Sequence, residues 1–473
     1  MMFTLGVLPS FATKPTPCRD RFLEPFASTS IWNTAIGSKA TYVPARLFLP
    51  DGPCGAPPCT AASSFHNDQD FFLRASPSDP LVPWLNQGDW GSDDHCVQHG
   101  AAVAKIPLPH NLTTASDGGR SVPGQPNNNA MGVLLLDNRS LVQMQPAYRC
   151  APGAPLLARF GNSTDGCPQA FPNVSDILVC VTRPPAFATA SLKDHRDHLS
   201  WAQGDGALGA HGGSGLSGVG GTIRLGELFS SAPIGHALKL ELQHRASASW
   251  RQPLSVLTNP TVIPSQLPSA WLARWLTQSS PTLGIACFSE WYFGGHPLQP
   301  CSVYNQGRRQ YVWPATGSDS GSDTTPNGLY RGTLPSLAPG ALLAIPAAHA
   351  SRVQTTTAIG GKIKEALVDY GGYLVDDTGA GNSAAICMHA DVNAEMRSAV
   401  GYSMTYPHGV SAAPTDPGRA LYDDLLALFQ ALHVVTTNGP HAVGGGGVPR
   451  QPTKPPICGD DGTPFVRADL VWI

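Results

Sequence analysis

A glycine-rich block at residues 209–228 holds the first side chain that could do chemistry. Its sequence, GAHGGSGLSGVGGTIRLGEL, contains eight glycines and carries His211 near its start. A His-Gly-Gly run is typical of esterase loops whose backbone N–H groups face a developing oxyanion. Such an enzyme also needs a G-x-S-x-G elbow, and the sequences around Ser214 and Ser217 do not fit it. We therefore expect His211, a candidate catalytic residue, either to face a ligand groove or to cap a loop.

Three further candidates follow the glycines. Arg224, in the expected strand TIRLGEL, could bind a substrate carboxylate through two hydrogen bonds, with Glu227 as a second substrate-binding residue. The competing interpretation is a salt bridge from Arg224 to Glu227 or Glu241. His236, a second candidate catalytic residue, shares the leucine face of the alternating run HALKLELQH. That position indicates either a core histidine or a residue in a concave cleft.

The run RRQYVWPA places Arg309, Tyr311 and Trp313 on one face of an expected strand. An aromatic ring can cover the face of a sugar, a guanidinium can bind a uronate carboxylate, and a phenol can transfer a proton. With His211 or His236 as the base, these residues could carry out a β-elimination on a uronate polymer. The competing interpretation is an aromatic stripe that faces the core, with Arg309 at its rim.

Metal-ligating residue types are dense in three short segments. FHNDQDFF contains His66, Asp68 and Asp70, which could bind Ca²⁺ or another divalent ion, although the spacing is not that of an EF-hand. DDHCVQH at 93–99 and DHRDH at 194–198 also contain paired histidines. The competing interpretation is a set of solvated turn residues, and no cofactor is required under it.

A glycosidase would need two carboxyl groups that face each other across the bond to be cleaved. Asp376 and Asp377 end the expected strand YLVDD, but neighbouring residues of a strand point to opposite faces. One of them would need a distant acid such as Glu227 or Glu290. The sequence names no such pair.

The composition excludes several classes of partner. Only 13% of the 473 residues are charged and the net charge is −3, with no basic run that would suit nucleic acid or an anionic membrane. No apolar stretch reaches the length of a membrane span. A polysaccharide is the partner that these features and the aromatic residues favour.

Cysteines and glycosylation motifs point to an extracellular protein. The eleven cysteines form no paired C-x-x-C zinc pattern, so we expect several disulfides and one free thiol. Asn-x-Ser/Thr motifs occur at four positions within 65 residues: Asn111, Asn138, Asn162 and Asn173. Both features favour an oxidising, secreted destination.

Strand-like runs outnumber helix-like runs by about three to one, which predicts a mainly β fold of the β-sandwich or jelly-roll kind. MGVLLL and SLVQMQPAY predict a hairpin over 131–149. Three helices, expected at 269–278, 360–373 and 419–435, would pack outside the sheets.

The chain divides into three parts at this level. Residues 1–20 are expected to be a leader or linker, with the apolar start of a weak signal peptide. Residues 21–440 are expected to form a single β-rich domain. Residues 441–473 include four consecutive glycines at 444–447 and are expected to be a Gly/Pro-rich tail.

Several blocks occur together in a recognisable order: the glycine-rich block, HALKLEL, QYVWPAT, GALLAIP, YGGYLVDDT and LHVVTTNGPHAVGGGGVPR. Through these blocks the chain resembles a family of uncharacterised secreted bacterial proteins. The resemblance implies one integrated architecture over roughly 130–450 and supplies no catalytic residue. A comparison with jelly-roll polysaccharide lyases is an analogy of fold class and secretion only.

The leading hypothesis is a secreted glycoprotein that acts on a polysaccharide, with a lyase acting on uronate-containing polymers preferred over a hydrolase. The first alternative is a non-catalytic protein of the extracellular matrix or cell wall. The second is a metal-dependent hydrolase built on the His/Asp clusters.

Overall fold

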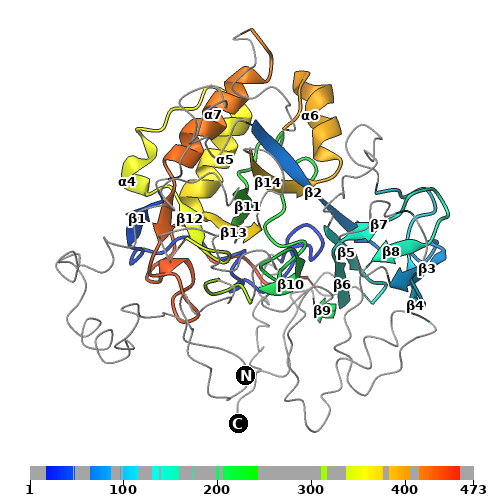
Figure 1. Ribbon diagram of the computed structural model, residues 1–473. Coiled ribbons are helices and arrows are strands. Elements are labelled where there is room, and N and C mark those ends of the chain that lie inside the picture. The colour runs from blue at the N-terminus through cyan, green and yellow to red at the C-terminus, as the bar shows by residue number, and fades with distance from the viewer. Residues whose placement is uncertain are drawn as a thin grey trace, which may run out of the picture.

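The protein is mainly β, as the sequence predicts: strands make up 31% and helices 16% of the described residues. The computed structural model describes residues 18–45, 47, 64–86, 96, 100–114, 130–137, 140–158, 173, 199–201, 206–242, 311–316, 337–376, 383–404 and 415–458. Two sheets, one of ten strands and one of four, carry the architecture of these residues (Figure 1).

The larger sheet mixes parallel and antiparallel pairs. Its strands, in spatial order, are β1 (Tyr42–Pro44), β15 (His433–Val435), β12 (Leu342–Ala344), β13 (Gly372–Asp376), β11 (Leu238–Leu242), β14 (Ser383–His389), β2 (Ser64–Arg74), β5 (Ala130–Leu134), β6 (Ser140–Met144) and β9 (Leu199–Trp201). Three neighbouring pairs are parallel: β11–β13, β14–β2 and β2–β5. The structure therefore does not confirm a jelly roll or sandwich, whose sheets are built from antiparallel strands.

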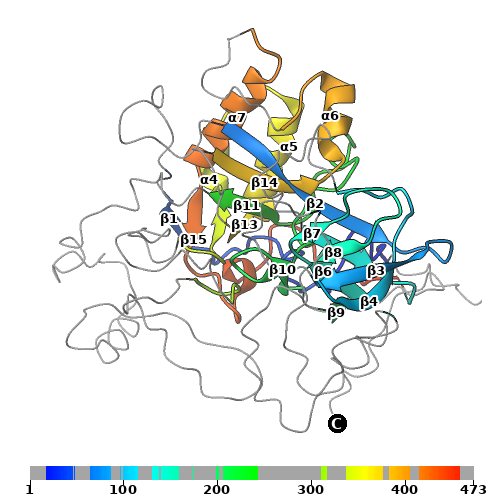
Figure 2. The ribbon, with the colours of Figure 1, turned by 45° about the vertical axis from the view of Figure 1, so that its right-hand side comes forward.

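The smaller sheet packs against the β5–β6 end of the larger one (Figure 2). It contains β4 (Ala102–Pro107), β3 (Leu81–Asn86), β8 (Leu156–Ala158) and β7 (Ala147–Tyr148). The expected hairpin is confirmed, since β5 and β6 pair antiparallel through Leu134 and Leu141. Asp137 holds its turn, because its Oδ1 accepts the N–H of Ser140 at 2.8 Å.

Helices cover one face of the larger sheet. The expected helices at 360–373 and 419–435 are confirmed as α5 (Ala358–Asp369) and α7 (Arg419–Gln430), and the chain after α7 turns into β15. Asp424 of α7 accepts the N–H groups of Thr356 and Thr357, both at 2.8 Å, at the start of α5. The expected helix 269–278 lies outside the described residues, and α4 (Ala347–Ala350) and α6 (Val392–Val400) were not expected. None of the helices described has the length and apolar character needed to cross a bilayer.

Strand β11 is buried on both faces, which the sequence did not indicate. Its leucines point into the core beneath α5 and α7, as the alternating pattern predicts. The polar face is also buried, with Lys239 0% and Glu241 2% exposed. An alternating pattern normally marks one solvated face, so here the chain must cover that face with another segment.

The covering segment includes the glycine-rich block. Gly220 and Gly221 lie against the Trp32 ring so closely that a Cβ on Gly220 would meet the ring at 2.3 Å. The Trp32 indole N–H donates to the carbonyl of Gly206 at 2.6 Å. Glycine is required here because two backbones and a large ring share the space above the sheet.

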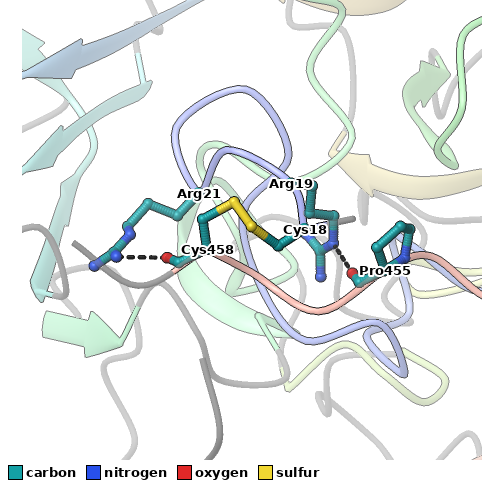
Figure 3. The surroundings of a disulfide bond; sticks show 5 residues. All are labelled: Cys18, Arg19, Arg21, Pro455 and Cys458. Carbon is teal, nitrogen blue, oxygen red and sulfur yellow. Dashed lines mark hydrogen bonds between the residues drawn. A yellow bond between two sulfur atoms is a disulfide. The ribbon is translucent and has the colours of Figure 1, made fainter. Parts of the chain in front are cut away.

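A disulfide joins Cys18 to Cys458, across 440 residues of sequence (Figure 3). Arg19 next to it donates from Nε to the Pro455 carbonyl at 2.8 Å, and Arg21 donates to the Cys458 carbonyl at 2.6 Å. Part of the expected Gly/Pro-rich tail is thereby held to the first described residues of the chain.

A second disulfide joins Cys96 to Cys150, and Cys387 is a free, buried thiol. Disulfides are thus present, as the sequence predicts. The remaining six cysteines lie outside the described residues: 54, 59, 167, 180, 287 and 301.

Candidate functional site

The start of the glycine-rich block positions His211. Strand β10 (Leu208–His211) ends at this histidine, and a tight turn follows it. A Cβ on Gly212 would lie 1.4 Å from Oδ2 of Asp376, and the Gly213 N–H donates to Asp376 Oδ1 at 3.2 Å. The glycines therefore let the backbone approach a carboxylate of a neighbouring strand.

Two glutamines at the end of β6 fix the same block from the other side. Gln143 Oε1 accepts the Gly218 N–H at 2.8 Å and the Ser217 hydroxyl at 2.9 Å. Gln145 accepts the Gly212 N–H. These bonds satisfy backbone donors that a bend without regular structure would otherwise bury unpaired.

The sheet beneath His211 presents a row of ionisable side chains from four adjacent strands. Cys387 of β14 is the register partner of Asp68 of β2, and Glu241 of β11 is the register partner of Asp376 of β13. A register shift between Leu240 and Glu241 brings Asp376 opposite Glu241. Such an irregularity changes which side chain a strand presents to its neighbour.

His211 contacts every member of this row. Its Nε2 lies 3.5 Å from Asp68 Oδ2, 3.5 Å from Cys387 Sγ and 3.7 Å from Glu241 Oε1. Its Nδ1 lies 4.0 Å from Asp376 Oδ2. The imidazole is fully buried, and Asp68 retains 12% side-chain exposure.

The two carboxyl groups beside His211 have pKa values shifted in opposite directions. Burial, followed by the neighbouring Asp68 and Asp376, raises the pKa of Glu241 well above its usual range. Burial also opposes ionisation of Asp68, but interactions with His211 and Glu241 outweigh it and lower the Asp68 pKa. A pair of acids separated in this way is typical of functional sites.

The same geometry fits a metal ion. One donor atom each from Asp68, His211, Glu241 and Cys387 lies within 4.8 Å of the others. Asp68 Oδ2 is buried without a hydrogen-bond partner among the described residues, a state that a bound ion or water commonly explains. Imidazole, thiolate and carboxylate are the ligands of zinc, whereas Ca²⁺ is bound by oxygen alone.

Cys387, His211 and Asp376 also follow the order of a nucleophile, a base and an orienting acid. A reactive cysteine needs an accessible thiolate in electropositive surroundings. Cys387 is fully buried, and burial, together with the nearby carboxylates, raises the pKa of its thiol well above the usual value. Its surroundings suit a metal ligand better than a nucleophile.

Next to this cluster lies a separate buried ion pair. Lys239 Nζ is 2.7 Å from Asp70 Oδ2, and both side chains are fully buried. The Thr222 hydroxyl donates to the same carboxylate oxygen at 2.6 Å, and Lys239 also donates to the Gly218 carbonyl at 3.0 Å. Of the three metal-site candidates in FHNDQDFF, only Asp68 belongs to the group of converging donors.

The other candidates near the block form a second, distinct group. His236 Nε2 lies 3.3 Å from Glu227 Oε2, and its Nδ1–H donates to the Ala237 carbonyl at 2.8 Å. Glu227 also accepts the backbone N–H of Arg224 at 2.5 Å. The structure therefore places His236 with Glu227, and His211 with Asp68.

The lyase candidates are only partly described. Tyr311 is 44% exposed and Trp313 packs against a core cluster, while Arg309 lies outside the described residues. Of the glycosylation motifs, Asn111 is exposed and Asn173 is partly buried. Asn138, Asn162, Glu290 and the histidines at 95, 99, 195 and 198 are outside the described part of the chain.

Sequence reasoning missed Glu241, Cys387 and the part played by Asp376. Glu241 sits on the polar face of an alternating strand, where a solvated position is the usual expectation. The one available signal was a glycine-rich segment immediately before that strand, long enough to cover it.

Comparison with protein-family models, curated proteins and solved structures found no match to the chain, so its resemblance to secreted bacterial proteins stays a prediction.

Proposed function

We propose that this protein is a metal-dependent enzyme that acts on a polysaccharide outside the cell. The observation that carries the proposal is the convergence of four metal-ligating atoms, from Asp68, His211, Glu241 and Cys387, within 4.8 Å. The donor set favours a zinc-type ion over Ca²⁺, because it includes a thiol and an imidazole.

A divalent ion held by these residues supplies Lewis-acid chemistry suited to hydrolysis. The chain's own residues would prepare the site. Asp376, facing His211 Nδ1, would fix the orientation and tautomer of the imidazole, as carboxylates behind metal-bound histidines do. Asp68 is the partly exposed member of the cluster, so substrate would approach from its side.

Polysaccharide as substrate and secretion as destination rest on other features. Two disulfides and an exposed Asn111 in a glycosylation motif support an extracellular protein. The low charge disfavours nucleic acid. The jelly-roll fold class and the analogy with polysaccharide lyases remain proposals. They support only the choice of a polysaccharide as the class of polymer.

Hydrolysis now ranks above β-elimination. A lyase built on His211 would need an accessible base beside Arg309 and Tyr311, whereas the His211 imidazole is fully buried among carboxylates.

A non-catalytic matrix protein is the second candidate, and one observation favours it. Three of the four donors are fully buried or nearly so, and four protein ligands in a closed shell are typical of a structural zinc site.

The test joins metal analysis to a polymer assay. The protein, purified from a secreting host, is analysed for bound divalent metal and then incubated with neutral and uronate polysaccharides. Release of reducing ends reports hydrolysis, and absorbance of unsaturated ends reports elimination. We expect about one zinc per chain and metal-dependent reducing ends. His211→Gln should lose both, and His433→Gln, a partly buried histidine on β15, should keep both.

Each of the other possible results of this test would support a different conclusion. Absence of bound metal together with failure of added zinc to bind would overturn the proposal. Unsaturated products would make the enzyme a lyase. Stoichiometric metal with no product from any polymer would favour the matrix protein.

A further inference from the structure

Arg224 is a buried cation, and two of its guanidinium nitrogens have no hydrogen-bond acceptor among the described residues. It is 7% exposed, its Nη2 donates to the Val219 carbonyl at 2.8 Å, and its guanidinium lies 4.6 Å from the centre of the Phe72 ring. Its Nε and Nη1 have no hydrogen-bond partner in the part of the chain that the structure describes. Unpaired N–H groups of a buried charge are costly, so a further acceptor is expected beside them.

The neighbouring carboxylates are already engaged with other side chains. Asp70 pairs with Lys239 at 2.7 Å, and Glu227 pairs with His236 at 3.3 Å. Burial lowers the pKa of Arg224 to about 10, although Glu227 and Asp70 counteract it. The guanidinium therefore lacks a carboxylate of its own within ion-pair distance among the described residues.

Arg224 lines a small pocket beside the glycine-rich block. His236 and Lys454 also line it, together with Trp32, Asn33 and Glu24. Lys454 and Glu24 form an ion pair with each other, so their charges offset. The pocket wall therefore includes the guanidinium of Arg224, whose Nε and Nη1 donors have no acceptor among the described residues.

We propose that this pocket binds a small inorganic anion of the halide class, for which chloride is the physiological probe. The lining atoms leave room for a group about the size of one water molecule, which excludes sulfate, phosphate and a sugar carboxylate. A halide is monatomic, which makes it smaller than these polyatomic anions, and it accepts hydrogen bonds from several directions. This inference does not rest on the proposed metal-dependent activity.

Such an anion would connect parts of the chain that are distant in sequence. Glu24, Trp32 and Asn33 belong to the segment after Cys18, and Lys454 lies close to Cys458 in the sequence. Arg224 lies in the glycine-rich block, and His236 lies between that block and β11. Anion binding is therefore expected to stabilise the folded state, because the site exists only when these segments are assembled.

The test compares chloride with gluconate, an anion too large for the pocket, at fixed ionic strength. We expect the melting temperature to rise with the logarithm of the chloride concentration above its dissociation constant, by about 1–3 °C at ten times that constant. Arg224→Met should abolish the rise. Arg74→Met, which removes a half-exposed arginine paired with Asp20, should retain it.

A second measurement on the unaltered protein covers the case in which Arg224→Met fails to fold. Crystals grown in bromide should show an anomalous peak in the pocket within hydrogen-bond distance of Arg224. Identical melting curves in chloride and gluconate, or a pocket without an anomalous peak, would overturn the proposal and leave a water molecule as the occupant.

Discussion

Replacing Lys239 by Met tests the buried ion pair that supports the site. The ammonium lies 2.7 Å from Asp70 Oδ2 with both side chains fully buried, and it also donates to the Gly218 carbonyl. Removing one partner of a buried pair leaves the other charge uncompensated, which costs about 3–5 kcal/mol of unfolding free energy. The Thr222 hydroxyl would remain as a donor to Asp70, so we expect the lower half of that range.

The double variant Asp70→Asn with Lys239→Met separates the charge from the packing. With both charges removed, most of the loss should be recovered, since pairs of this kind can be replaced at little net cost. Urea unfolding followed by tryptophan fluorescence measures each variant. Arg74→Met, which breaks a half-exposed pair with Asp20, is the control and should cost less than about 1 kcal/mol. A loss below about 1 kcal/mol for Lys239→Met would refute the reasoning.

Three further sets of substitutions test the close approach at Gly212, the charge of Glu227 and the two disulfides. Gly212→Ala places a Cβ 1.4 Å from Asp376 Oδ2, so we expect a loss of about 1–3 kcal/mol and weaker zinc binding by titration. Gly439→Ala, where a Cβ meets nothing within 4 Å, should change stability by less than about 0.5 kcal/mol, and equal losses at both glycines would count against the close approach. Burial opposes ionisation of Glu227, but His236 and the Arg224 N–H outweigh it and lower its pKa. Its stabilisation is therefore present above the unfolded-state pKa and disappears as the pH falls through the folded-state value. Glu227→Gln should flatten this acid limb in pH-dependent urea unfolding, and an unchanged limb would remove Glu227 as its source. Replacing Cys18 and Cys458 by Ser should cost about 2 kcal/mol more than replacing Cys96 and Cys150, because 440 rather than 54 residues separate the bridged cysteines. Equal losses in calorimetry would show that loop entropy does not decide the difference.

Local patterns in the sequence were sufficient for several elements. The turn at Asp137 between two apolar runs predicted the β5–β6 hairpin, because a polar turn and paired strands are encoded within twenty residues. Helical spacing of apolar residues predicted α5 and α7. The mainly β composition followed from the same kind of short-range signal.

Strand order and the direction of pairing were not encoded locally. Strand β2 pairs in parallel with β14, which lies more than three hundred residues later, and no local feature of either strand specifies that choice. The short α6 was also missed. Tertiary contacts decide such pairings, because a strand's hydrogen-bonding edges carry little information about their partner.

The sequence by itself determined that a glycine-rich backbone had to approach another part of the chain or a ligand closely at His211. It also made His211 a candidate functional side chain. Only the tertiary structure decided what it approaches. Asp68, Glu241, Asp376 and Cys387 come from four strands that become neighbours only in the assembled sheet. The face of β11 that carries Glu241 is polar in sequence and buried in the fold. The opposite pKa shifts of Asp68 and Glu241 depend on that burial, because a low-dielectric interior strengthens the electrostatic interactions between them.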